Sequence, residues 1–347
     1  MDPSTYRNQS LDVLRALAVI AVVGHHLDYY PIWTKAGWVG VDLFFVLSGF
    51  LISGLLFQEY KASGKIEVRR FLLRRGLKIW PSYYLLLIGV TCLYFFNKSA
   101  MSKGQLLSNL FVIQNYFPGH PNYLILSHTW TLALEEHFYL FLPLLLVFLI
   151  AIRKESPFSV IPPLSVLIAV VCLCFRFTLL PHELAWATHM RADGLFGGVT
   201  LGYLHHFKPF WFAKLTGNYA LLMTALLISP AFLFEQPDRR IQRFGLTSIA
   251  LGFIFLVAWA VVRSPRSRAM QITLGGFARV GVYSYSIYLW HTVIADGFLF
   301  HPPSSFAKFW LYMISSITGG IAMAHLVEIP YLRLRDRMFP TGRQETQ

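Results

Sequence analysis

Residues 11–27 read LDVLRALAVIAVVGHHL, an apolar run that carries two ionisable side chains of interest, Arg15 and His26. Ionisable groups are rare in bilayer-spanning segments because they are costly to bury in hydrocarbon. Ten residues separate Arg15 from His26, which on an α-helix puts both on nearly the same face, roughly 16 Å apart. His25 points about 80° away from that face. The run predicts a membrane helix whose polar stripe faces a polar interior.

The whole chain has the composition of a membrane protein. Of its 347 residues, 55% are hydrophobic and only 14% are charged, against about 25% charged in soluble proteins. We predict an all-α, polytopic membrane helix bundle with about ten transmembrane helices of ~20 residues each. Residues 105–127 contain a further apolar piece that is too short to span and could be re-entrant. The predicted spans cover about residues 11–29, 37–57, 77–96, 128–151, 159–179, 187–206, 215–234, 244–262, 280–299 and 309–328.

The basic residues are distributed unevenly. The net charge is +13, and most Lys and Arg fall between predicted spans on the side of the N-terminus, a bias typical of the cytoplasmic side. We therefore predict cytoplasmic termini, a multi-pass protein of the cell (inner) membrane, and no nucleic-acid partner. Residues 1–335 are predicted to form one membrane domain and residues 336–347 a short basic cytoplasmic tail. The chain after Pro330 is expected to be partly disordered.

Polar residues on four predicted helices reach a common depth in the membrane. They are His26, Asp42, Glu135 and the pair Arg191 and Asp193. Such groups cost several kcal/mol each in lipid, so their convergence indicates that they satisfy one another around a cavity. Histidine is the usual general base near neutral pH, and a carboxylate often orients it. His26 with Glu135 or Asp42 would make such a dyad.

A structural interpretation of the same layer stays open. In that interpretation Asp42 and Glu135 pair with Arg191, Asp12 pairs with Arg15, and the histidines serve as neutral donors. The three cysteines, which lie within apolar spans, fit neither a disulfide framework nor a zinc site, and no metal is expected.

A basic run precedes the third predicted span, at Arg69, Arg70, Arg74, Arg75 and Lys78. One interpretation is charge that sets topology and attracts anionic lipid headgroups. The other is a site for a multiply phosphorylated ligand, because guanidinium groups bind phosphate in bidentate fashion.

Several motifs together resemble the integral-membrane acyltransferase-3 family, over nearly the whole chain. The Arg15–x10–His26 spacing is similar to the opening motif of that family. The order and spacing of the motifs carry the resemblance, since each alone is weak. The further matching stretches are GVDLFFVLSGFLI at 40–52, RRGLKIWP at 74–81, WTLALEEHFY at 130–139, RADG at 191–194, SIYLWH at 286–291 and EIP at 328–330.

The resemblance implies a ten-helix core that takes acetyl or another short acyl group from acyl-CoA in the cytoplasm. The acceptor in this family is often a glycan on the outer side. The family's catalytic histidine maps to His26, its arginine to Arg15, and its acid to Glu135 rather than the adjacent Glu136. Lys78 departs from the family's usual arginine and lacks its bidentate fork. Some members carry an additional esterase-like domain, which this chain is expected to lack.

Together these observations predict an O-acyltransferase that uses acetyl-CoA or another acyl-CoA and a carbohydrate or glycolipid acceptor. The basic run would hold the nucleotide phosphates, and the pantetheine arm would pass Arg15. His26 would deprotonate the acceptor hydroxyl. Arg191 or Ser48 would stabilise the oxyanion, and Asp193 is a further candidate for binding substrate. The alternative is a transporter or flippase for a lipid-linked sugar or a small polar solute.

Overall fold

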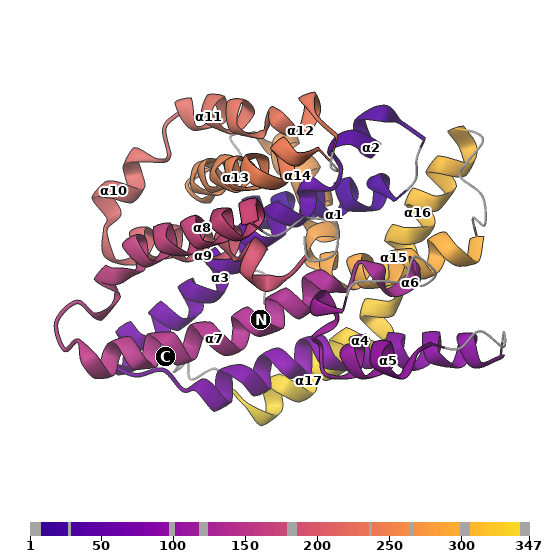
Figure 1. Ribbon diagram of the computed structural model, residues 1–347, viewed down its shortest axis with the longest axis horizontal. Helices are drawn as coiled ribbons and strands as arrows, with labels where there is room; N and C mark the ends of the chain where they lie inside the picture. Colours follow the sequence, from indigo (N-terminus) through magenta and orange to yellow (C-terminus); the bar gives the residue numbers. More distant parts are fainter. Residues whose placement is uncertain are drawn as a thin grey trace.

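The structure is a computed structural model that describes residues 8–26, 29–96, 101–117, 124–178, 186–235, 238–263, 267–298 and 306–340. In these ranges the regular structure is entirely helical, which confirms the all-α fold class (Figure 1). Each of the ten predicted apolar segments contains a helix. These helices are α1 (Gln9–His25), α3 (Val39–Ser63), α4 (Val68–Phe96), α7 (Trp130–Ile152), α8 (Ile161–Thr178), α9 (Thr188–Phe207), α11 (Tyr219–Ile228), α13 (Leu246–Val261), α15 (Ser284–Phe298) and α16 (Phe306–Met323).

Six helices of the described chain are long and apolar enough to cross a bilayer, so ten spans and cytoplasmic termini stay predictions. The predicted span 215–234 is broken after α11, where Pro230 opens the short helix α12 (Pro230–Leu233). Proline lacks an amide hydrogen and favours the first turn of a helix, which explains the break. The six helical segments are Val39–Ser63, Val68–Phe96, Ile125–Ile152, Pro157–Thr178, Ile241–Val261 and Phe306–Met338.

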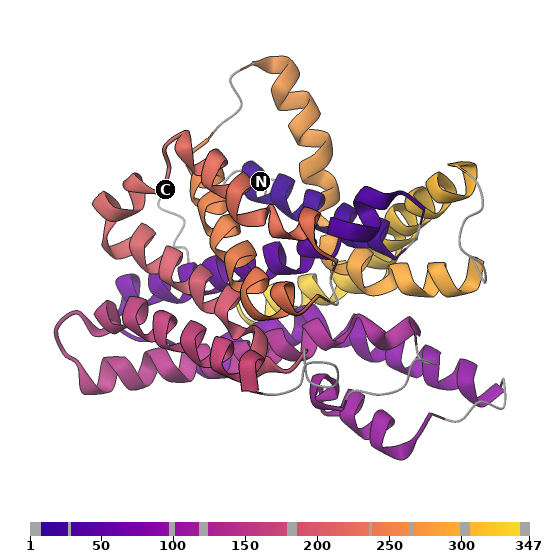
Figure 2. The same ribbon diagram turned by 45° about the horizontal axis from the view of Figure 1, so that its top comes forward.

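The described residues of the stretch 105–127 contain short helices, none of them long enough to span a bilayer. Ser102 and Gln105 make a capping box that starts α5 (Lys103–Leu110), an arrangement that satisfies two backbone donors at once. The hydroxyl of Tyr83 on α4 donates to the carbonyl of Asn109, so α5 lies against α4 (Figure 2). The other short elements of the described residues include α2 (Pro31–Ala36), η2 (Gln114–Tyr116), α6 (Leu124–Ser127), η3 (Pro157–Val160), α10 (Pro209–Lys214) and the π-helical segment η4 (Ile241–Gly245).

A helix occupies most of the chain between the predicted spans that end at 262 and begin at 280. This helix, α14 (Arg268–Val282), begins at Ser267, whose side chain caps its first turn. A Cβ added at Gly281 would lie 1.8 Å from the carbonyl oxygen of Asp12, so the absence of a side chain lets α14 pack directly on α1. Figure 2 shows α14 at the top of the view, rising away from the bundle.

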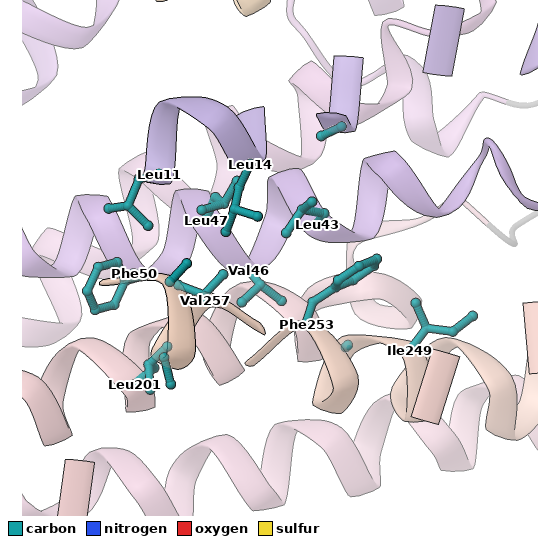
Figure 3. Packing of buried hydrophobic residues seen from close by; sticks show 14 of the residues in the cluster. Leu11, Leu14, Leu43, Val46, Leu47, Phe50, Leu201, Ile249, Phe253 and Val257 are labelled. Carbon is teal, nitrogen blue, oxygen red and sulfur yellow. The ribbon is translucent and has the colours of Figure 1, made fainter. Parts of the chain in front are cut away.

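Close backbone contacts place α3 in the centre of the bundle. A Cβ at Gly49 would lie 2.0 Å from the carbonyl oxygen of Leu195, and one at Gly198 would lie 2.3 Å from that of Val46. Small residues allow this approach between helices in lipid, and they press α3 against α9. The surrounding core joins α1, α3, α9 and α13 (Figure 3) and includes Leu14, Leu47, Phe50, Leu201 and Phe253.

Residues 331–338 are helical. The helix α16 continues through the π-helical segment η5 (Ala324–Glu328) into α17 (Ile329–Met338), which lies against α4. Of the tail that was predicted to be partly disordered, residues 331–338 are therefore ordered, and they contact α4. Residues 341–347 of the predicted tail lie outside the described residues.

Candidate active site

A cavity of about 110 Å³ lies between α1, α3, α4, α7, α14 and α15. It brings together five side chains that were predicted from separate stretches of sequence: Arg15, Ser48, Arg75, Lys78 and Glu135. Aliphatic and aromatic side chains complete much of its wall. The other polar residues of the wall are Thr131, Tyr139, Ser284, Tyr285 and Tyr288.

Three cations, Arg15, Arg75 and Lys78, line this cavity, and we call them the cationic group. The guanidinium of Arg75 lies 5.6 Å from the ring centre of Tyr139 and 5.8 Å from that of Phe71, a cation–π arrangement that fixes its position. Arg15 also pairs with Asp12 at 3.4 Å, as the structural interpretation of the sequence predicts.

The side chain of Glu135 lines the same cavity as the cationic group. Its Oε2 accepts a hydrogen bond of 2.7 Å from the hydroxyl of Tyr139, one helical turn further along α7. Because Tyr139 donates its proton to Glu135, the hydroxyl of Ser48 donates to Tyr139, at 2.9 Å. Glu136 instead accepts from the indole nitrogen of Trp80 at 3.1 Å. Helical periodicity therefore separates the two adjacent acids, and Glu135 is the one on the cavity wall.

His26 caps the C-terminal end of α1 and lies against His291 of α15. Its Nδ1 is 2.9 Å from the carbonyl oxygen of Val22 and 3.3 Å from Nε2 of His291. The ring centre of His128 lies 5.1 Å from that of His291. We call His26, His128 and His291 the histidine cluster; within the described residues no group of three or more His, Cys, Asp or Glu is arranged to hold a metal.

Tyr288 lies next to both the cavity and the histidine cluster. Its side chain lines the cavity, and its ring centre lies 5.2 Å from that of His128 and 5.8 Å from that of His291. Its hydroxyl donates to the carbonyl of His128 at 3.0 Å and lies 2.7 Å from Oγ1 of Thr131. His128 and His291 therefore lie beside the part of the cavity wall that Tyr288 and Thr131 form.

The predicted dyad between His26 and a carboxylate has no direct contact here. Over the described ranges, no hydrogen bond or ion pair joins His26 to Glu135 or to Asp42. Glu135 is engaged by Tyr139, and Asp42 by Arg191. The catalytic roles of these residues stay predictions, and the structure adds His128, His291 and Tyr288 as neighbours. The motif SIYLWH at 286–291 contains two of these, although the sequence analysis gives neither a role.

Asp42, Arg191 and Asp193 belong to a separate, closed group. Asp42 pairs with Arg191 at 2.8 Å, and Asp193 pairs with Arg176 of α8 at 2.8 Å. Thr247 of α13 donates to Asp193 at 2.6 Å. The side chains of the four paired residues are each less than a tenth exposed. We call Asp42, Arg176, Arg191 and Asp193 the ion-pair cluster. Its members do not line the cavity, and the sequence analysis missed Arg176.

The five residues of the basic run divide into three sets. Arg75 and Lys78 line the cavity. Arg74 donates to Asp336 at 3.1 Å and to the carbonyl of Phe339, and Arg70 donates to the carbonyl of Pro340. Arg69 is exposed. The C-terminal segment that begins with α17 therefore contacts the basic run beside the cavity (Figure 1).

Several known proteins are similar to this chain in sequence. The peptidoglycan O-acetyltransferase OatA of Listeria monocytogenes is 30% identical over 309 residues, which are 81% of this chain and 48% of that protein. The O-acetyltransferase OatA of Staphylococcus aureus is 29% identical over 304 residues, 81% of this chain and 49% of that protein. A putative O-acetyltransferase of S. aureus strain COL is 29% identical over 309 residues, 82% and 50% of the two chains.

The chain spans about half the length of these curated relatives. No solved structure matches it. The family model of acyltransferase-3, described as an acyltransferase domain, matches residues 8–325. Because this match covers nearly the whole chain, the protein belongs to the acyltransferase-3 family.

Proposed function

We propose that this protein is a membrane-embedded O-acyltransferase that moves an acetyl or other short acyl group from acyl-CoA to a carbohydrate hydroxyl. The observation that carries the proposal is the cavity, whose wall combines the cationic group with Glu135 and ends beside the histidine cluster. Membership of the acyltransferase-3 family favours this function over a transporter or flippase.

The cationic group fits the phosphates of the donor. Arg75 and Lys78 lie one helical turn apart on α4, and Arg15 joins them from α1. Guanidinium and ammonium groups together neutralise several phosphate charges, and Arg75 adds bidentate geometry. The more apolar part of the cavity, near Phe44 and Leu132, suits the pantetheine arm. The predicted topology places the cationic group on the cytoplasmic side, where acyl-CoA is available.

His26 is proposed as the general base. It would remove the proton of the acceptor hydroxyl while the oxygen attacks the thioester carbonyl carbon. The new C–O bond forms, the C–S bond breaks, and the CoA thiolate leaves and takes the proton from the imidazolium. Of the two groups predicted to stabilise the oxyanion, Ser48 lines the cavity, whereas Arg191 faces Asp42. We therefore favour Ser48 for this role, in which its hydroxyl would turn its hydrogen from Tyr139 to the oxyanion.

A glycan is the proposed acceptor. Listeria OatA is named as a peptidoglycan O-acetyltransferase, and His26 is exposed at the end of α1, remote along that helix from Arg15. An acceptor can therefore approach His26 from the end of α1 opposite to the one nearest Arg15. On the predicted topology that is the outer side of the membrane.

Purified protein in proteoliposomes tests the proposal. Radiolabelled acetyl-CoA is supplied on one side, and soluble peptidoglycan fragments are the acceptor probe. We expect acetyl-CoA binding, release of CoA thiol and label on the glycan. Failure to bind acetyl-CoA or to release thiol, at a confirmed folded state, would overturn the proposal. Uptake or flipping of the fragments without acetyl transfer would instead support the transporter.

A further inference from the structure

We propose that His291 is a positioning residue for His26: it accepts a hydrogen bond from the Nδ1–H of His26 and leaves Nε2 of His26 as the basic nitrogen. This inference rests on the proposed role of His26 as general base. It places in His291 the orienting role that the sequence analysis gave to Glu135 or Asp42.

The tautomer of His291 follows from its own hydrogen bond. Its Nδ1 lies 2.6 Å from the backbone carbonyl oxygen of Tyr288, and a carbonyl oxygen can only accept. The hydrogen of neutral His291 therefore lies on Nδ1, and Nε2 presents a lone pair. That lone pair faces Nδ1 of His26 at 3.3 Å.

The tautomer of His26 follows in turn. Its Nδ1 lies between two acceptors, the carbonyl oxygen of Val22 at 2.9 Å and Nε2 of His291 at 3.3 Å. The hydrogen of neutral His26 must therefore lie on Nδ1, so Nε2 has a free lone pair for a substrate proton. The two rings meet edge to face, with centres 4.7 Å apart and planes at 74°.

The arrangement also serves the charged form of His26. When Nε2 takes the proton of the acceptor hydroxyl, the hydrogen on Nδ1 remains between Val22 and His291. Both contacts then become charge-assisted hydrogen bonds, which are roughly twice as strong as neutral ones. His291 thus supports the imidazolium as well as selecting the tautomer.

The position of His291 is fixed by its surroundings. The side chain is fully buried, with 0% exposed. On the same helix, Thr292 donates to the carbonyl of Ile125 at 2.8 Å, and Tyr288 donates to that of His128. A Cβ at Gly320 of α16 would lie 2.4 Å from the Cα of Ile287, so α16 presses on this turn of α15. His291 therefore has little freedom to turn away from His26.

The test compares His291→Phe, which keeps a planar ring and loses the acceptor, with His291→Gln, whose amide oxygen can lie near the place of Nε2. His325→Phe is the matched control, because His325 is exposed and lies outside the site. CoA thiol release in the presence of peptidoglycan fragments gives kcat and KM, and equilibrium binding gives the Kd of acetyl-CoA.

We expect kcat of His291→Phe to fall about 100-fold, the lower range of general-base catalysis, with the Kd of acetyl-CoA unchanged. His291→Gln should recover about tenfold of that loss. His325→Phe should stay within about twofold of the parent. Adding His291→Phe to His26→Ala should cause no further loss, because residues that act as a unit are not additive.

Full activity of His291→Phe, or a Gln variant as impaired as the Phe variant, would overturn the inference. If His291→Phe no longer binds acetyl-CoA, His291→Gln is compared with His291→Asn, whose amide oxygen lies one bond nearer the backbone. An active Gln and an inactive Asn variant support the inference, and equal activities contradict it. If His26→Ala retains activity, His26 is not the general base, and the proposed mechanism fails. If only the His291 variants behave unexpectedly, the inference about His291 fails and the role of His26 stands.

Discussion

The cavity and the ion-pair cluster use the same residue types in opposite ways. Both contain arginines and carboxylates, and α3 contributes to both, with Ser48 in the cavity and Asp42 in the cluster. In the cluster each guanidinium meets a carboxylate at 2.8 Å, away from the cavity. In the cavity Arg75 and Glu135 line an open space. A charged group in a membrane helix therefore indicates a catalytic or binding role only where it lines a cavity, and not where it is fully paired in the packed interior.

The largest expected difference concerns His26. His26→Ala should lower acyl transfer by about 10²–10⁴, because it removes the general base. His25→Ala should retain much of the activity, since Nδ1 of His25 lies 3.3 Å and 3.1 Å from the carbonyl oxygens of Trp33 and Thr34 and so contacts the α2 segment. Transfer by both variants at equal expression decides this. Equal losses would remove the basis for choosing His26.

The ion-pair cluster should respond in stability rather than in catalysis. Asp42→Ala leaves Arg191 buried without its carboxylate, and breaking a buried pair costs about 3–5 kcal/mol. We expect a lower thermal unfolding temperature in detergent, with the activity per folded molecule nearly unchanged. A stable variant whose turnover collapses would instead place Asp42 in the reaction and erase the distinction between the two regions.

Glu135 and Glu136 allow a residue of the cavity wall to be compared with its neighbour on the same helix. Glu135→Gln should lower turnover by about 100-fold, because an amide cannot balance the cationic group or accept equally well from Tyr139. Donor affinity should change little. Glu136→Gln should stay close to the parent, since Glu136 contacts Trp80 instead. Single-turnover acyl transfer distinguishes the two variants. An inactive Glu136→Gln variant would show that Glu136, rather than Glu135, is the acid that the reaction needs.

The smallest expected effect is on acetyl-CoA affinity, and it should differ between two residues of the basic run. Arg75→Ala should weaken acetyl-CoA binding about tenfold, equal to about 1.4 kcal/mol, because Arg75 lines the cavity. Arg74→Ala should weaken it less, since Arg74 is held by Asp336 and the carbonyl of Phe339. Equilibrium binding of acetyl-CoA to the two variants measures the difference. Unchanged affinity in Arg75→Ala would favour the other interpretation of the basic run, in which its charge sets the topology and attracts lipid headgroups.

The amino-acid sequence alone predicted where the helices lie and which side chains share a helical face. Backbone hydrogen bonds in lipid are satisfied within one helix, so apolar runs such as 11–29 and 128–151 locate helices from local information. Helical periodicity also placed Glu135 on a different face from Glu136. The pairing of Asp12 with Arg15, three residues apart, follows from the same local geometry.

Which distant groups meet could be seen only once the helices were packed together. Asp42 and Arg191 are 149 positions apart, and His26 and His291 are 265 apart, so no local period relates them. The pairing of Asp42 with Arg191 was one of two alternatives in the sequence, whereas the contact of His26 with His291 was not foreseen. The rotation of each helix about its axis, set by close contacts such as Gly49 on Leu195, fixed both. Helical faces are local properties of a chain, but the partner that each face meets is decided by packing.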